Sequence, residues 1–144
     1  CELNDRSSAV ASRMGVRACT DVTGFGLVGH LVEMARASKC RLRLRSKAVP
    51  LLEGADAAAS MGLIPAGAYA NREFYAAWTT LDPSVDNVRA DLMFDPQTSG
   101  GLIIGVNAGD ASELLSALIA EGVENAAEIG EVEADDPEGR LQID

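Results

Sequence analysis

At residues 21–26 the chain reads Asp21-Val22-Thr23-Gly24-Phe25-Gly26, between Ala18-Cys19-Thr20 and Leu27-Val28-Gly29-His30. One carboxylate lies here among hydroxyl side chains and glycines, just ahead of a helical apolar pattern. A carboxylate in such a loop can bind a hard cation, and glycines let the backbone approach phosphate oxygens closely. The stretch predicts a loop for nucleotide phosphate and magnesium, between a short strand over 16–19 and a helix over 27–38.

The loop fits no standard nucleotide fingerprint. Gly24, Gly26 and Gly29 have the G-x-G-x-x-G spacing, but no acidic residue follows a second strand about 20 positions on, as the dinucleotide motif requires. The lysine of a Walker A loop is also absent after the glycines. A tight strand-to-helix turn with Asp21 as a local cap therefore stays open beside the phosphate interpretation.

A second loop has the same chemical character. Residues 95–101 supply a carboxylate, an amide, two hydroxyls and two glycines, and the apolar run 102–106 that follows predicts a buried strand. If both loops meet at one end of a sheet, they form a shared site for a polyanion.

The remaining periodicities predict a mixed set of helices and strands. Helices are expected from Asn4 or Asp5 to Met14 and over 54–61 and 110–121, and strands over 41–45, 126–132 and 140–143. A turn is expected at 64–67. A short helix or an ordered loop is expected over 71–80, and an extended or helical segment over 88–94. Because strands and helices do not alternate strictly, we expect an α+β fold with a mixed β-sheet covered by helices. No internal repeat or linker divides the 144 residues, so one domain is expected.

Composition narrows the classes of partner. The net charge of −10 argues against nucleic acid, although residues 36–47 carry half of the basic side chains. No run approaches the length of a membrane span, and three cysteines without a C-x-x-C pair favour a reducing cytoplasm. The chain also lacks an initiator methionine, which suggests that an upstream portion has been removed.

Individual side chains have mostly structural interpretations. The alternating Arg41, Arg43 and Arg45 form either a solvated sheet face or an anion site, and the solvated face is favoured. His30, the single histidine, has no partners for a zinc site or a hydrolytic triad, so packing or hydrogen bonding is expected. Cys19 is expected to be buried. The aromatic residues Phe74, Tyr75 and Trp78 are expected to pack rather than to stack on bases.

Two long motifs resemble signatures of the selenophosphate synthetase (selenide, water dikinase) family. They are residues 18–30 and 95–102, and shorter matches at 49–52, 67–73 and 129–132 extend the resemblance over essentially the whole chain. It implies that residues 1–144 are the carboxyl-terminal domain of a two-domain ATP-dependent synthetase, with the amino-terminal domain absent. The implied fold is that of the carboxyl-terminal domain in the aminoimidazole ribonucleotide synthetase superfamily.

The resemblance also implies an activity and a division of labour. Family members make selenophosphate, AMP and orthophosphate from ATP, selenide and water, and they dimerise through their amino-terminal domains. Asp21 corresponds to a magnesium-binding aspartate, and Thr20, Thr23, Gly24 and Gly26 would shape the loop beside the phosphates. The catalytic residues, including a Cys or selenocysteine and a Lys, belong to the other domain, and none of Cys1, Cys19 and Cys40 matches that nucleophile. The chain alone is therefore expected to be inactive.

Two alternatives remain at this stage. The chain could come from another ATP-using member of the superfamily, such as a thiamine-monophosphate kinase or a hydrogenase maturation factor, whose loops differ at these positions. It could also be a non-catalytic interaction module for selenium. The sequence upstream of this chain distinguishes the first alternative, and magnesium-dependent ATP binding distinguishes the second. The arginine-rich strand departs from what the family leads us to expect.

Overall fold

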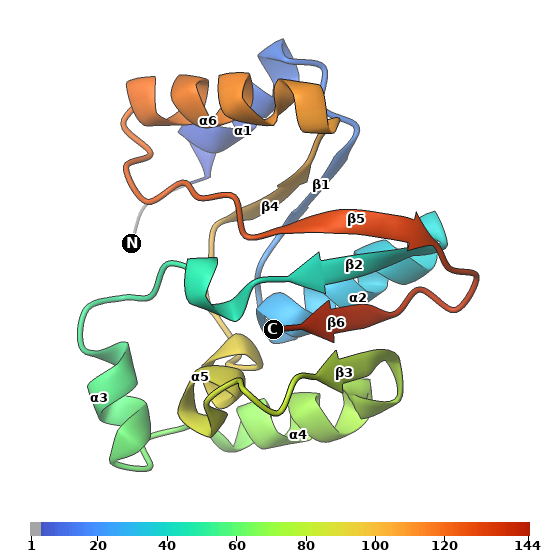
Figure 1. The fold of residues 1–144 in the computed structure, drawn as a ribbon. Coiled ribbons are helices and arrows are strands. Elements are labelled where there is room, and N and C mark those ends of the chain that lie inside the picture. Colours follow the sequence, from blue (N-terminus) through green and yellow to red (C-terminus); the bar gives the residue numbers. More distant parts are fainter. Residues whose placement is uncertain (1–3) are drawn as a thin grey trace.

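The computed structural model describes residues 4–144 and contains two β-sheets flanked by helices (Figure 1). The helices are α1 (Asp5–Arg13), α2 (Gly26–Ser38), α3 (Ala55–Ser60), α4 (Ala66–Tyr75), α5 (Asn87–Met93) and α6 (Ala111–Ala120). The strands are β1 (Ala18–Asp21), β2 (Cys40–Leu44), β3 (Thr79–Leu81), β4 (Leu102–Gly105), β5 (Gly130–Asp135) and β6 (Leu141–Ile143).

The larger sheet is mixed, as predicted. Its strand order is β3-β6-β2-β5, in which β6 runs parallel to both β2 and β3 and β5 runs antiparallel to β2. The smaller sheet is an antiparallel ribbon of β1 and β4 that pairs Asp21 with Leu102. The larger sheet thus combines β2 from the first half of the chain with β5 and β6 from its C-terminal part, and the predicted α+β fold is confirmed.

Helix α2 forms the centre of the larger core because its apolar residues recur at helical spacing. Val28, Val32 and Ala35 have no exposed surface. Val28 and Val32 belong to a cluster that includes Leu44 of β2 and Ile143 of β6, and α2 lies behind this sheet in Figure 1. Burying a valine side chain contributes about 1.5–3 kcal/mol, so this stripe anchors the helix that follows the Asp21 loop.

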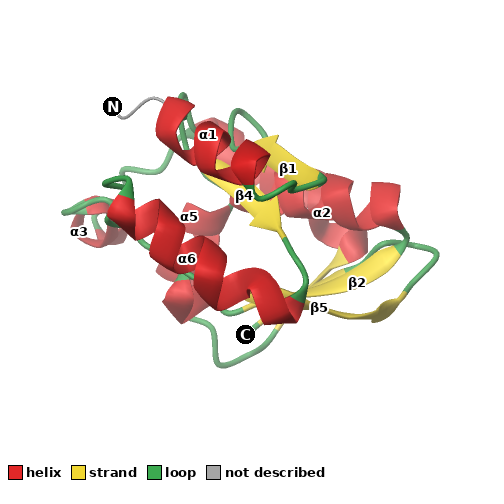
Figure 2. Ribbon diagram, turned by 90° about the horizontal axis from the view of Figure 1, so that it is seen from above, coloured by secondary structure: helices red, strands yellow, loops and turns green. Residues whose placement is uncertain are grey.

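A second, smaller core lies between α1, α6 and the two-stranded ribbon. Val10, Leu114 and Leu118 form its centre, and Ile104 of β4 packs against them. Figure 2 shows α1 and α6 side by side over β1 and β4. The ribbon therefore lies between this core and the larger one, to which Ile103 belongs.

Several boundaries differ from the sequence predictions. Strand β1 covers Ala18–Asp21, so Thr20 and Asp21 end a strand instead of opening the loop. Helix α4 begins at Ala66, after Pro65 in an extended conformation, and this replaces the predicted turn. Strand β3 was missed because three residues are too few to show alternation. Strand β5 begins at Gly130, not at residue 126.

The apolar run over 102–106 forms a strand, but it is not fully buried. Only Ile103 is buried within β4, whereas Leu102 and Ile104 are partly buried and Gly105 is exposed. Among residues 4–144, no helix combines the length and the apolar character needed to cross a membrane.

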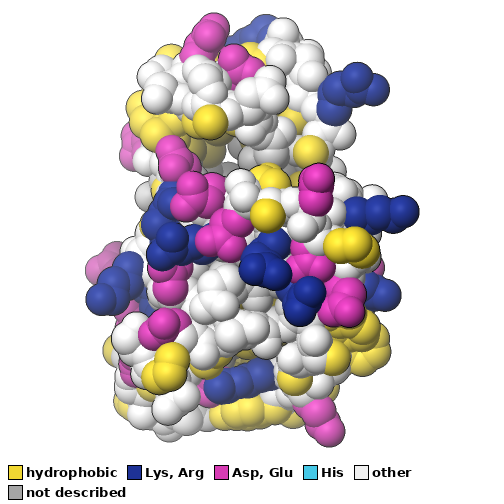
Figure 3. All heavy atoms as spheres, turned by 45° about the vertical axis from the view of Figure 1, so that its right-hand side comes forward, with side chains coloured by type: hydrophobic (Ala, Val, Ile, Leu, Met, Phe, Trp, Pro, Cys, Tyr) yellow, Lys and Arg dark blue, Asp and Glu magenta, His cyan; other side chains and the backbone are white. Residues whose placement is uncertain are grey.

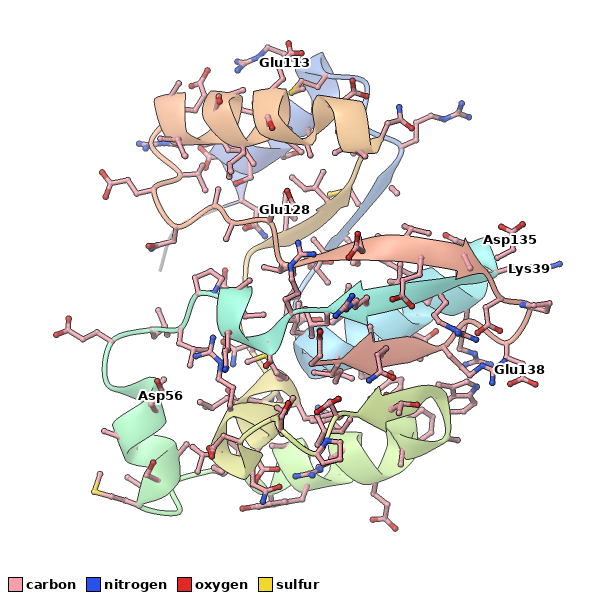
Figure 4. All side chains as sticks on the ribbon, viewed as in Figure 1. Lys39, Asp56, Glu113, Glu128, Asp135 and Glu138 are labelled. Carbon is pink, nitrogen blue, oxygen red and sulfur yellow. The ribbon has the colours of Figure 1, made fainter. Side chains whose placement is uncertain are left out.

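The arginine-rich strand β2 forms a charged outer face of the larger sheet. Arg43 pairs with Asp144, and Arg45 reaches Glu128 at 2.7 Å and Glu131 at 3.3 Å. Acidic and basic side chains intermingle on this side of the molecule in Figure 3, and Figure 4 labels Glu128 beside the start of β5. Carboxylates of the chain itself thus pair with these guanidinium groups, an arrangement that neither the solvated-face nor the anion-site interpretation predicted.

Asp136, in the turn between β5 and β6, is the buried member of this network. Its side chain is 2% exposed and accepts hydrogen bonds from Arg140 Nε at 2.9 Å, from Arg41 Nε at 3.4 Å and from the Glu138 N–H at 3.1 Å. The hydrogen bonds from Arg140, with those from Glu138 and Arg41, hold the pKa of Asp136 below its usual value even though burial raises it.

We expect Asp136→Asn to lower the melting temperature at pH 7 by several degrees. A lowered folded-state pKa gives stability that is present above the unfolded-state pKa of about 3.9 and is lost as the pH falls through the folded value. The difference in melting temperature between wild type and variant should therefore shrink progressively as the pH falls below about 5. Thermal unfolding across this range measures it, with the exposed neighbour Asp135→Asn as control. A difference in melting temperature that stays constant with pH would contradict the proposed contribution of the ionised Asp136 carboxylate.

Candidate functional site

Asp21 is the last residue of β1 and is exposed to solvent. Its backbone oxygen accepts a hydrogen bond from Thr20 Oγ1 at 3.3 Å. Within the part of the chain that the structure describes, its carboxylate forms neither an ion pair nor a side-chain hydrogen bond, so Asp21 does not cap the following helix. The carboxylate is free to bind a ligand from outside this chain.

The two glycine-containing loops meet, which is the condition that the sequence analysis set for a shared site. The Val22 N–H donates to Gly101 O at 2.9 Å, and the Gly100 N–H donates to Val22 O at 2.9 Å. The Gln97 N–H adds a third bond, to Thr23 O at 3.1 Å. The 95–101 loop therefore braces the Asp21 loop along its backbone, which is its visible role in this structure.

His30 holds the same loop from the side of helix α2. Its Nε2 accepts the Thr23 N–H at 3.0 Å and lies 3.1 Å from Thr23 Oγ1. Because Nε2 accepts a backbone N–H, the neutral ring carries its proton on Nδ1. The predicted hydrogen-bonding role of His30 is confirmed, and the hydroxyl of Thr23 faces the scaffold.

The glycines of the motif have different requirements. Gly26 has φ +70°, and a Cβ there would lie 2.7 Å from the carbonyl carbon of Phe94. A Cβ at Gly29 would lie 2.7 Å from the ring of Tyr75. Around Gly24 there is open space, with nothing within 4 Å of an added Cβ. The fold itself thus explains Gly26 and Gly29, whereas it does not explain Gly24.

Asn71 on α4 contacts the site, and sequence reasoning gave it no role. Its Nδ2 donates to Gly24 O and to Phe94 O, each at 3.0 Å. Asparagine is a poor residue for a helix interior because its side chain competes for backbone hydrogen bonds. That anomaly within α4 was the one local signal that could have drawn attention to it.

Asp95 and Cys19 lie near the loop but are poor candidates for chemistry. Asp95 accepts a hydrogen bond from Gln97 Nε2, and burial raises the pKa of its carboxyl against that bond. Cys19 is exposed, so the prediction of a buried cysteine was wrong; the buried one is Cys40. Partial desolvation of the sulfur and the nearby charge of Asp21 raise the Cys19 pKa, which disfavours the nucleophilic thiolate. Cys1 lies outside the described residues.

An apolar groove adjoins the loop on the side of α4. Its lining includes Phe25, Asn71, Phe74 and Tyr75. Tyr75 is buried as predicted, but Phe25 is 54% exposed and Phe74 is 64% exposed. Phe74 nevertheless packs as expected, with its ring centroid 4.9 Å from that of Tyr75 and 6.2 Å from that of Trp78, although it is not buried.

The described residues do not form a complete metal site. No group of three His, Cys, Asp or Glu side chains within residues 4–144 is arranged to hold a metal ion. Asp21 can supply one oxygen ligand, and Mg²⁺ commonly takes one or two protein carboxylates while retaining waters. The donor chemistry therefore fits a single ligand contributed to a site that other groups complete.

Comparisons with known proteins agree with the motif resemblance. The family model described as "AIR synthase related protein, C-terminal domain" matches residues 3–142. The chain is 44% identical over 142 residues to a selenide, water dikinase of Pelobacter propionicus. The alignment covers 99% of this chain and 40% of that protein. A Caldanaerobacter subterraneus selenide, water dikinase is 47% identical over 78% of this chain and 32% of its own length, and one from Clostridioides difficile is 40% identical over 90% and 37%.

Among solved structures, the hydrogenase maturation protein HypE aligns with a TM-score of 0.49 and 23% identity, covering 83% of this chain and 29% of that chain. This chain spans about 40% or less of the length of the curated relatives named above. The match over residues 3–142, together with identities of 40–47%, confirms the resemblance found in the motifs. The chain belongs to the AIR synthase related protein family, whose C-terminal domain it matches over nearly its full length.

Proposed function

We propose that this chain is the carboxyl-terminal domain of a selenide, water dikinase. Relatives with that name are 40–47% identical to it, and this chain covers only 32–40% of their length. The full-length protein would convert ATP, selenide and water to selenophosphate, AMP and orthophosphate. It would act in the cytoplasm as a homodimer joined through the preceding domains.

The observation that carries the proposal is the free carboxylate of Asp21 on a loop braced from several sides. ATP is a polyanion, so a carboxylate can approach it only through a cation. Asp21 would bind Mg²⁺, and the remaining ligands would come from the preceding domain, the nucleotide and water. A magnesium ion at this position would neutralise charge on the phosphate groups.

The backbone next to Asp21 suits the phosphate side of such a site. None of the hydrogen bonds found among residues 4–144 uses the N–H groups of Gly24 and Phe25, which precede helix α2. Backbone donors at a helix N-terminus favour anions. Gly24 would let phosphate oxygens approach, while Thr20, Thr23 and Gly26 would maintain the shape of the loop.

The test compares this chain with the full-length protein. We expect the full-length protein to form AMP from ATP only when selenide is present, and we expect residues 1–144 alone to form none. The reason is that the loop offers a metal ligand and backbone donors but no nucleophile or phosphate-binding lysine. Detection of AMP by chromatography or ³¹P NMR measures the activity of the full-length protein and of residues 1–144. AMP formation by the isolated chain would contradict the split site, and a selenide-independent reaction in the full-length protein would contradict the proposed activity.

A further inference from the structure

Asn71 uses both hydrogens of its side-chain amide in hydrogen bonds at the site. The NH₂ group has two hydrogens, and its two acceptors, Gly24 O and Phe94 O, each lie 3.0 Å from Nδ2. The opposite orientation of the amide would place its oxygen against two carbonyl oxygens, so the orientation is well determined by its partners. One side chain therefore joins helix α4 to both the tip of the Asp21 loop and the end of α5.

The hydrogen bond to Gly24 O has a consequence for the next N–H along the chain. A trans peptide is planar, so the C=O of Gly24 and the N–H of Phe25 point in opposite directions from the same plane. By holding the Gly24 carbonyl toward α4, Asn71 turns the Phe25 N–H away from α4. Phe25 donates no hydrogen bond within the described residues, so this donor is available to a ligand.

The preceding peptide is oriented by the same logic, but by other groups. Thr23 O accepts the Gln97 and Gly26 N–H groups at 3.1 Å and 3.0 Å, which turns the Gly24 N–H the opposite way. Open space around Gly24 means that side-chain packing does not restrain this residue. Asn71 is the side chain whose hydrogen bond restrains the Gly24 carbonyl among residues 4–144.

We propose that Asn71 is a positioning residue that fixes the Gly24–Phe25 peptide plane so that the Phe25 N–H donates to a phosphate oxygen of the nucleotide. The inference rests on the proposed function, because the anion is the phosphate chain of ATP. Under this proposal, Asp21 and Asn71 have separate tasks at the same loop. Asp21 acts through the metal, whereas Asn71 acts on the phosphate through a backbone donor and does not touch the metal.

The test is ATP binding by the full-length protein at saturating and at titrated magnesium. Asn71→Ala should raise the dissociation constant for ATP at saturating magnesium about tenfold, the effect of losing one well-aimed hydrogen bond to a charged group. The magnesium concentration at half-maximal binding should not change. Asp21→Asn should instead shift that magnesium midpoint upward.

Two further variants keep the test decisive. Asn71→Leu has nearly the same size, lacks the NH₂ donors and adds no charge, so it should weaken ATP binding as Asn71→Ala does. Leu118→Ala, in the smaller core, should lower the melting temperature while leaving the dissociation constant for ATP unchanged. Weakened binding in the Leu118 variant would show that general destabilisation explains the Asn71 result and would overturn the inference.

The outcomes distinguish the inference from the function on which it rests. If wild type shows no magnesium-dependent ATP binding, both are overturned. If Asp21→Asn shifts the magnesium midpoint but the Asn71 variants bind ATP normally, only the role of Asn71 is overturned. A magnesium midpoint shifted by Asn71→Ala as far as by Asp21→Asn would also overturn it, because Asn71 would then act through the metal.

Discussion

Asp21→Asn in the full-length protein is expected to lower kcat/KM for ATP by about 10²–10³-fold, the range seen when a group that stabilises transition-state charge is removed. The amide oxygen of asparagine keeps the shape of the side chain but loses the negative charge that attracts Mg²⁺. The defect should therefore lessen as magnesium is raised. Initial rates of AMP formation, measured over a magnesium titration, test both the size of the loss and its partial recovery.

The same substitution should leave folding almost unchanged. Asp21 is exposed and its carboxylate has no partner among the described residues, so its removal breaks no contact seen in the structure. Asp56→Asn on α3, which also replaces an exposed aspartate and lies apart from the loop in Figure 4, is the matched control and should retain wild-type activity. Full activity in the Asp21 variant at limiting magnesium would rule out the proposed metal role.

Gly26→Ala is expected to destabilise the chain by about 2–5 kcal/mol. The left-handed conformation of Gly26, φ +70°, costs an L-residue roughly 1–2 kcal/mol. The new Cβ would also lie 2.7 Å from Phe94 C and 2.8 Å from Phe94 O, which are backbone atoms that cannot move aside as a side chain can. Overpacking of this kind costs typically about 1–3 kcal/mol more. Urea unfolding monitored by circular dichroism measures the total change in the free energy of unfolding.

Gly24→Ala is the matched comparison, two residues away in the same loop. Its added methyl group meets nothing within 4 Å, so stability should change by less than about 0.5 kcal/mol. ATP binding by the full-length protein should nevertheless weaken, because the methyl group would occupy space proposed for the phosphates. Equal losses of stability in the two variants would show that the loop does not have the conformation described.

The parts of the fold that could be predicted from sequence are those set by local periodicity. The apolar stripe of α2 and the alternation of β2 each come from neighbouring residues, and their elements appear where expected. The contact between the two loops was also foreseeable. The loops have similar polar residues, and one follows a strand while the other precedes one. Strand β3 has no such local signal, because Thr79–Leu81 exists as a strand only through its pairing with β6.

The site shows the same limit more sharply. The position of Asp21 and the hydrogen bond from Thr23 to His30 lie within one short motif. Asn71, however, reaches Gly24 across 47 positions and Phe94 across 23, and no periodicity encodes such contacts. The exposure of Cys19 was missed for a related reason, since burial in a two-stranded ribbon depends on what covers each face.

The isoleucines of β4 give the ribbon a fixed alignment. Ile103 packs into the larger core and its neighbour Ile104 into the smaller one, on opposite faces of the same strand. A slip of β4 by one residue in one direction would put Ile104 in the place of Ile103 and Gly105, which has no side chain, in the place of Ile104, so the smaller core would lose this contact. The alignment also sets Asp21 opposite Leu102. The order of the side chains along β4 thus contributes to the position of the carboxylate along the ribbon.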